Sequence, residues 1–360
     1  MKDAGPNSSA LELAKLQTRL FEQLEQARKD NDKDSFTKIQ DRLLWTSTAH
    51  KLAQLNELVP DDPEAGPTSR QLLNSLFNEA QSGNVHAQTA IALLAANDSR
   101  EARKVREGEN ASEVNQAQLR IQEIETGLPE LPIPNLEHFS REQQIAIEKV
   151  ATSLIAKKVN ATDGKLSRQE AIAVSEIYAR AQKSGDGETA RLMLNTLDLA
   201  LGRTTDSKSG EGRQAAIGAL SDLVQSGKGD LEINSRYLTF ADDQTIKEDL
   251  PALKQLAKSG NTESINLLAG IAASGRVDLA EDAHKEMVEL ARDEKLAQRA
   301  MRAAIEARDV HTGDRTRATQ LFKEMASNGK VPDSVKELLY LKLGADATER
   351  TQAARALTAI

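Results

Sequence analysis

The chain has 360 residues, of which 39% are hydrophobic and 28% charged, a composition typical of folded soluble proteins. The absence of cysteine excludes disulfides, thiolate metal sites and cysteine nucleophiles. The net charge of −8 and an aromatic content of only 3% disfavour nucleic acid as a partner, because they provide neither an overall basic surface nor base-stacking platforms. No stretch approaches the ~18 apolar residues of a membrane span, and the first residues lack a secretory signal core, so we expect neither membrane insertion nor conventional secretion.

The N-terminal part of the chain has the pattern of paired helices. Residues 1–8 are small and polar, and we expect them to be disordered. Apolar residues then recur at three- and four-residue steps from Leu11 to Leu24 and from Phe36 to Leu55, which predicts two amphipathic helices in a hairpin. A second helix–turn–helix surrounds the turn Ser82–Asn84. We therefore expect a small helical region over residues 9–126.

A proline-rich stretch marks the expected domain boundary. Gly127–Asn135 contains three prolines, which bar a continuous helix, so we expect a linker over residues 127–139. Ser140 and Gln143 have capping-box spacing and predict the start of a new helix. That helix carries the apolar series Ile145, Ile147, Val150, Leu154 and Ile155.

The remainder, residues 140–360, almost lacks the period-two alternation of strands. Only Leu231–Phe240 is compatible with a short strand. We therefore predict an all-α chain of helices of about 10–16 residues joined by short loops.

Internal self-similarity is the strongest signal in the chain. Several segments share a helix end, a Ser/Asn-Gly turn and a new apolar helix. From residue 227 the turns follow at steps of 33, 33 and 36 residues, a period of about 34 that fits two helices and two turns. Because one hairpin cannot bury both of its apolar faces, we expect the hairpins to stack as an α-solenoid or superhelix. The turn positions are Gly83, Gly185, Gly227, Gly260, Asp293 and Gly329.

The segments INLLAGIAASGRVDLAEDAHKEM (Ile265 to Met287) and ATQLFKEMASNGKVPD (Ala318 to Asp333) carry a family resemblance. With the repeated turns, they resemble the tetratricopeptide-like and HEAT-like α-solenoid superfamily. Parts of these segments also resemble pentatricopeptide-type hairpins. The resemblance covers residues 140–360 and an outlying unit at 70–97. It implies stacked helical hairpins; an irregular helical bundle with recurrent Ser-Gly turns is the alternative.

One stretch has the outline of a calcium loop. Asn160–Glu170 is similar to the second half of an EF-hand loop. The first half fails, because Val159 and Ala161 have no side-chain oxygen for the metal. Ser167 and Glu170 are better explained as a capping box that opens the next helix.

No other pattern indicates chemistry. Asp309, His311 and Asp314 are best interpreted as a turn between helices, and the chain has no HExxH, phosphate-loop or GxSxG motif. We therefore predict no metal, no cofactor and no catalytic residue from the sequence.

The sequence favours a non-enzymatic scaffold or adaptor that binds a protein or peptide on a helical-repeat surface. Asn266, Arg299 and Tyr340 lie on expected second helices of hairpins and are the predicted partner-binding residues. A nucleic-acid-binding helical repeat is the first alternative. An enzyme with an all-α active site is the second, because a site assembled from distant residues leaves no local motif.

The composition is also compatible with a bacterial protein. The absence of cysteine and the acidic, Ala/Gln/Ser-rich character suit the cytoplasm. The polar N-terminus would equally suit an effector exported by a non-Sec route into a host cell. The oligomeric state is left open.

Overall fold

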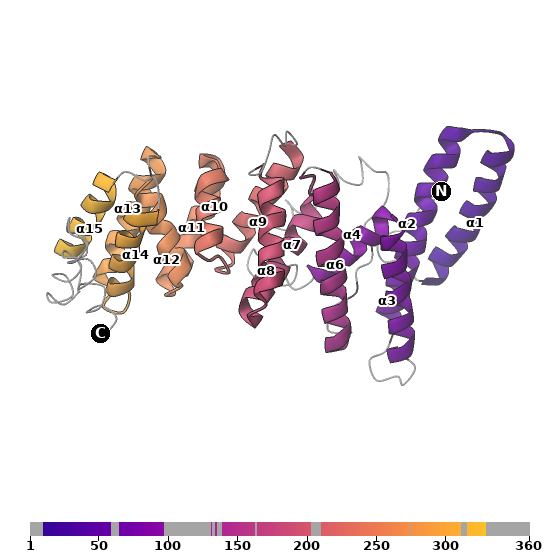
Figure 1. The fold of residues 1–360 in the computed structure, drawn as a ribbon, viewed down its shortest axis with the longest axis horizontal. Helices are drawn as coiled ribbons and strands as arrows, with labels where there is room; N and C mark the ends of the chain where they lie inside the picture. The colour runs from indigo at the N-terminus through magenta and orange to yellow at the C-terminus, as the bar shows by residue number, and fades with distance from the viewer. Residues whose placement is uncertain are drawn as a thin grey trace. The chain divides into compact units, whose positions relative to one another are not determined.

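The computed structural model describes residues 10–58, 65–96, 131, 134, 139–162, 164–202, 210–274, 276–310 and 315–328. These residues form helices and turns and contain no strand (Figure 1). The predicted all-α class is therefore confirmed for the described part of the chain. The contacts divide the chain into two compact units, Met1–Ala216 and Ile217–Ile360.

Two expectations about the N-terminal half lie outside the described residues. The expected disordered segment 1–8 is not described, and of the expected linker 127–139 only Leu131, Pro134 and Phe139 are. All three of these residues are buried.

The strand alternative for Leu231–Phe240 is wrong, because this segment forms helix α10. The Asp230 side chain accepts a hydrogen bond from the backbone N–H of Ile233 and so caps the helix. Ile233 and Tyr237, four residues apart, are both fully buried on one side of the helix. The cap and this spacing outweigh the β propensity of the segment's branched and aromatic residues.

The first unit is built from seven helices that the structure describes completely within it. Each packs against the next one along the chain, and from α2 onward each also packs against the next but one. Successive helices therefore alternate between two rows, with α2, α4 and α7 in one and α3, α6 and α8 in the other. The helices are α1 (Ala10–Lys29), α2 (Lys33–Glu57), α3 (Ala65–Gln81), α4 (Val85–Ala95), α6 (Arg141–Ala161), α7 (Arg168–Ser184) and α8 (Gly187–Ala200).

Side-chain caps set the starts of these helices. Ser140 with Gln143 and Ser167 with Glu170 form the two predicted capping boxes, both confirmed. Gly185 ends α7 in the left-handed conformation, with φ of 75°, and the Asp186 side chain then caps α8. Helix ends at Ser-Gly turns are thus explained by backbone geometry and local hydrogen bonds.

The second unit has the same alternation. Helix α9 (Gly210–Gln225) crosses the boundary between the units. Beyond it, α10, α12 and α14 pack in one row, α11, α13 and α15 in the other, and neighbours from α11 onward also pack across the rows. The bounds are α10 (Leu231–Phe240), α11 (Asp243–Lys258), α12 (Thr262–Ala272), α13 (Val277–Arg292), α14 (Ala297–Val310) and α15 (Arg315–Asn328).

Helix α12 lies at the centre of the second unit. It contacts helices of both rows, and nearly every residue from Ser264 to Ala273 is buried. Its N-cap, Asn261, accepts hydrogen bonds from the backbone N–H and the hydroxyl of Ser264. The Asn261 amide also donates to the carbonyl of Gly227, 3.1 Å away and 34 residues earlier. A single side chain therefore caps α12 and ties two successive turns together.

We predict that Asn261→Ala lowers the free energy of unfolding by about 1–2 kcal/mol, because it removes both the cap and the tie. Asn261→Asp is the matched control: it retains the cap acceptor but loses the amide donor, so its loss should be smaller. Urea unfolding followed by circular dichroism measures both values. An alanine variant as stable as the wild type would contradict the role assigned to Asn261.

Candidate protein-binding surface

The turns of the second unit are joined by hydrogen bonds that cross from one hairpin to the next. Gly227 has a φ of 68°, and a Cβ there would come within 2.9 Å of the Asn261 amide nitrogen. Arg299 on α14 donates from Nη1 to the carbonyl of Gly260, 2.9 Å away, in the turn before α12. Close backbone approach and side-chain donors thus link consecutive turns at the N-terminal end of α12.

Arginines make similar links at the other end of these helices. Arg276 donates to the carbonyls of Leu238 and Ala241 at the C-terminal end of α10, at 3.3 and 2.8 Å. Arg317 on α15 donates to the carbonyl of Ser274, 3.1 Å away, at the C-terminal end of α12. The last carbonyls of a helix lack an intrahelical partner, and here an arginine from later in the chain donates to carbonyls at the helix end. Side-chain hydrogen bonds to backbone carbonyls therefore link the second unit at both ends of its helices.

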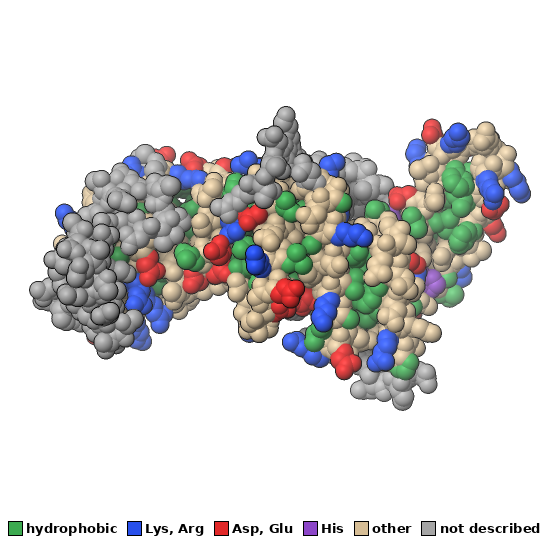
Figure 2. Space-filling view, in the orientation of Figure 1, with side chains coloured by type: hydrophobic (Ala, Val, Ile, Leu, Met, Phe, Trp, Pro, Cys, Tyr) green, Lys and Arg blue, Asp and Glu red, His purple; other side chains and the backbone are tan. Residues whose placement is uncertain are grey.

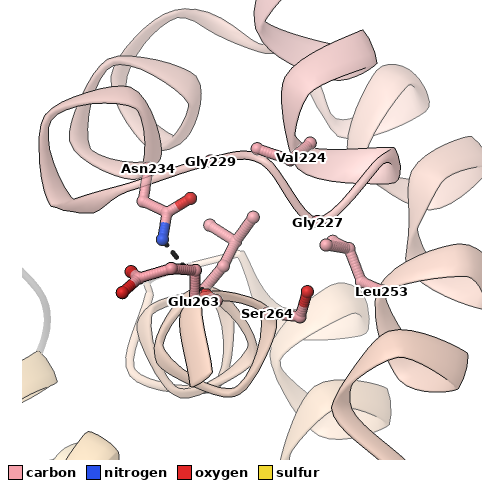
Figure 3. A pocket seen from close by; sticks show the side chains of 8 residues that line it. Val224, Gly227, Gly229, Asn234, Leu253, Glu263 and Ser264 are labelled. Carbon is pink, nitrogen blue, oxygen red and sulfur yellow. Dashed lines mark hydrogen bonds between the residues drawn. The ribbon is translucent and has the colours of Figure 1, made fainter. Parts of the chain in front are cut away.

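The recess between these turns holds no ligand-sized space. Asn234 on α10 and Glu263 on α12 face it, and the Asn234 amide donates to the backbone carbonyl of Glu263 at 3.1 Å (Figure 3). Val224, Leu253 and Leu267 fill the remainder and leave no room for a molecule the size of water. We interpret this recess as a packed joint between hairpins.

A buried carboxylate lies in the same unit. Asp249 on α11 is 2% exposed and accepts hydrogen bonds from the hydroxyl of Tyr237, at 2.5 Å, and from the amide of Gln225. Burial raises the pKa of Asp249, although these hydrogen bonds oppose the rise. Burial also raises the pKa of Tyr237 above its ordinary range. The group connects α9, α10 and α11 and is a structural network.

The calcium-loop segment has a structural role. Glu170 is buried, forms an ion pair with Lys158 at 2.8 Å and completes the capping box with Ser167. Its carboxylate is therefore occupied by the chain itself. Among the described residues, no three His, Asp or Glu side chains are grouped so that they could hold a metal ion.

The row formed by α3, α6 and α8 in the first unit has a different surface. Each helix has one stripe of exposed residues at three- and four-residue steps, as expected for a helix buried on its opposite side. We call these stripes together the α3–α6–α8 face. They are Pro67, Arg70, Gln71, Asn74, Asn78 and Gln81 on α3; Arg141, Glu142, Ile145, Lys149, Ser153, Lys157 and Asn160 on α6; and Glu188, Arg191, Leu192 and Asn195 on α8.

Basic residues outnumber acidic ones on the α3–α6–α8 face. Its acidic members are Glu142 and Glu188, and the capping residue Asp186 lies at its edge. Figure 2 shows basic, acidic and hydrophobic side chains interspersed over this region. In a chain whose net charge is −8, this is a local basic surface. Its basic members are Arg70, Arg141, Lys149, Lys157 and Arg191.

Two aliphatic side chains lie among these charges. Ile145 on α6 is 43% exposed and Leu192 on α8 is 37% exposed. An open depression of about 420 Å³ borders α8, lined by Gly187, Glu188, Arg191, Leu192 and Asn195. Because Gly187 has no side chain, it contributes to the open space. The face therefore combines cations, exposed aliphatic groups and a hollow, as protein-binding surfaces do.

In the second unit, charged side chains of α11, α13 and α15 contact one another across neighbouring helices. Ion pairs join α11 to α13 through Lys254 and Asp282 at 2.7 Å and through Lys258 and Glu286 at 3.0 Å. His284 on α13 lies 2.8 Å from Glu324 on α15. These contacts join neighbouring helices of the row to one another.

The residues predicted from the sequence have separate surroundings. Asn266 is half-buried on α12, with its amide 3.5 Å from the carboxylate of Glu263 on the same helix. Arg299 is exposed but donates to the Gly260 carbonyl. Tyr340 lies outside the described residues. Their role in partner binding stays a prediction.

The α3–α6–α8 face escaped the sequence analysis because Ile145 continues an apolar series. Ile147 and Ile155 of that series are buried, whereas Ile145 is exposed. Lys149 and Arg191 had no distinguishing pattern, since charged residues are frequent on any helix surface. An aliphatic residue next to the capping box, on the polar side of α6, was the available signal.

Comparison with known proteins leaves the chain without an assigned family. No protein-family model matches it, and no curated protein is significantly similar to it in sequence. None of the helices in the described ranges combines the length and apolar character needed to cross a membrane. The functional argument therefore depends on the surfaces described above.

We predict that Asp249 makes wild-type stability fall with rising pH relative to Asp249→Asn. Because burial raises the pKa of Asp249, the folded state holds the proton more tightly than the unfolded state. Its stabilising contribution is complete below the unfolded pKa and is lost as pH rises through the folded pKa. The loss is about 1.4 kcal/mol per unit of pKa increase.

Urea unfolding of wild type and Asp249→Asn from pH 4 to pH 8 measures this difference. The asparagine variant retains a carbonyl oxygen for Tyr237 and has no charge to lose. Comparison of the two proteins also cancels the titration of other carboxylates. A stability difference that stays constant across this pH range would contradict the prediction.

Proposed function

We propose that the protein is a non-enzymatic scaffold whose helical hairpins stack as an α-solenoid and which binds a protein partner on the α3–α6–α8 face. The observation that carries the binding proposal is the combination of exposed Ile145 and Leu192 with basic residues and an open hollow on one helix row. Contact with a partner would remove the exposed area of Ile145 and Leu192 from water, which favours association.

Two features support the solenoid arrangement. Within each unit, helices contact their nearest and next-nearest neighbours along the chain, as stacked hairpins do. In the second unit the Asn261–Gly227 hydrogen bond spans 34 residues, which equals the turn period found in the sequence. Such stacks present an extended surface made of one helix from each hairpin.

The same face bears on the nucleic-acid alternative. Five exposed basic residues could contact phosphates. Glu142 and Glu188 would repel a polyanion, and Ile145 and Leu192 would lie against a charged backbone without benefit. These four residues favour a protein partner.

Site-specific photo-crosslinking in the source cells tests the proposal. A photoreactive amino acid replaces Asn195 on the α3–α6–α8 face, and the matched control replaces the exposed Gln255 on α11. We expect a defined protein adduct at position 195 only, and its loss when Ile145→Asp is added. Because Ile145 is exposed, that substitution should change the free energy of unfolding by no more than about 0.5 kcal/mol.

The other outcomes of the crosslinking experiment are equally specific. Identical adducts at both positions, or no adduct at either, would contradict protein binding at this face. A nuclease-sensitive adduct at position 195 would identify nucleic acid as the partner and overturn the proposal.

A further inference from the structure

We propose, on the basis of the function proposed above, that the α3–α6–α8 face recognises an acidic segment of its partner that carries aliphatic anchor residues. The aliphatic anchors would contact Ile145 and Leu192 and enter the depression beside α8. The partner's carboxylates would pair with Lys149 and Arg191. The inference rests on charge complementarity and on the composition of the depression.

The basic side chains of this face are available for pairing. Neither Lys149 nor Arg191 has a carboxylate within 4.0 Å among the described residues, and Lys149 interacts electrostatically with Asp186 at longer range. Other basic residues of the same unit are paired: Lys51 with Glu79 at 2.7 Å, and Arg180 with Glu148 at 3.2 Å. A partner's carboxylate could therefore pair with Lys149 or Arg191 without displacing an existing ion pair.

The acidic groups of the region narrow the range of partners. Hydrogen bonds from Thr189 lower the pKa of Asp186, which therefore stays ionised, and Lys149 is close enough to contribute to this shift. Glu188 lines the depression itself. A uniformly charged polyanion would meet these carboxylates, whereas a segment with separated acidic and aliphatic residues can avoid them.

The depression suits side chains of a docking segment. It is open to solvent, and all of its described lining residues lie on α8. Leu192 provides an apolar wall, and Arg191 stands next to it on the same stripe. Apolar contact and ion pairing can therefore occur together on adjacent residues of one helix.

Fluorescence anisotropy with the full chain tests the inference. The probe is a labelled peptide of about 15 residues with alternating Glu-Glu and Leu-Leu pairs; the control peptides replace Glu by Lys or Leu by Ser. We expect saturable binding of the Glu/Leu peptide and no saturable binding of either control peptide. Added salt should weaken the binding about tenfold, because it screens the ion pairs between peptide and protein.

Variants locate the binding to the face. Lys149→Glu combined with Arg191→Glu should weaken peptide binding at least tenfold, and Leu192→Asp should weaken it comparably. The matched control is Lys247→Glu, which reverses an exposed charge on α11 and should leave affinity unchanged. Circular dichroism and thermal unfolding establish that each variant is folded as the wild type is.

The outcomes separate this inference from the proposed function. The inference would be overturned if the Glu/Leu peptide failed to bind, or if the face variants bound it as well as the wild type does. The proposed function would still stand if position 195 gives its protein adduct. Tighter binding of a single-stranded oligonucleotide or of phosphatidylserine vesicles, lost in the same variants, would assign the face to another ligand class and also overturn it.

Discussion

The structure depends on the burial of helices that have apolar residues on more than one side. Helix α12 in the second unit is the extreme case, because nearly all of its residues from Ser264 onward are buried. One hairpin partner cannot cover such a helix, so stability requires neighbours in its own row and in the opposite row. The alternation of helices between two rows satisfies this requirement in each unit.

Stacking of this kind exposes many helix ends, whose backbone groups need partners. In the second unit, Asn261, Arg276, Arg299 and Arg317 provide them from later parts of the chain. These hydrogen bonds fix the register between successive turns, since each donor reaches carbonyls at one helix end or turn. The buried group of Tyr237, Asp249 and Gln225 acts similarly, because an unpaired buried carboxylate would be costly.

Burial of one side of a helix leaves a stripe of residues on its opposite side exposed to solvent. In the α11, α13 and α15 row, the pairs Lys254–Asp282 and Lys258–Glu286 and the contact of His284 with Glu324 join neighbouring helices. In the α3, α6 and α8 row, Ile145 and Leu192 are exposed among basic residues. The first arrangement contributes to the fold of its unit, whereas the second gives a partner both apolar area and charge. We therefore propose the first unit as the site of partner binding.

The sequence was sufficient to predict the helical class of the described residues, both capping boxes and the turns at Gly83, Gly185, Gly227 and Gly260, because periodicity, caps and left-handed glycines act over a few residues; the turn predicted at Gly329 lies outside the described residues. It could not decide whether Leu231–Phe240 is helix or strand, nor that Arg299 would donate to a carbonyl 39 residues away. The sequence also could not identify the candidate surface, since Ile145 and Ile147 belong to the same apolar series. Only packing against neighbouring helices buries one and leaves the other exposed.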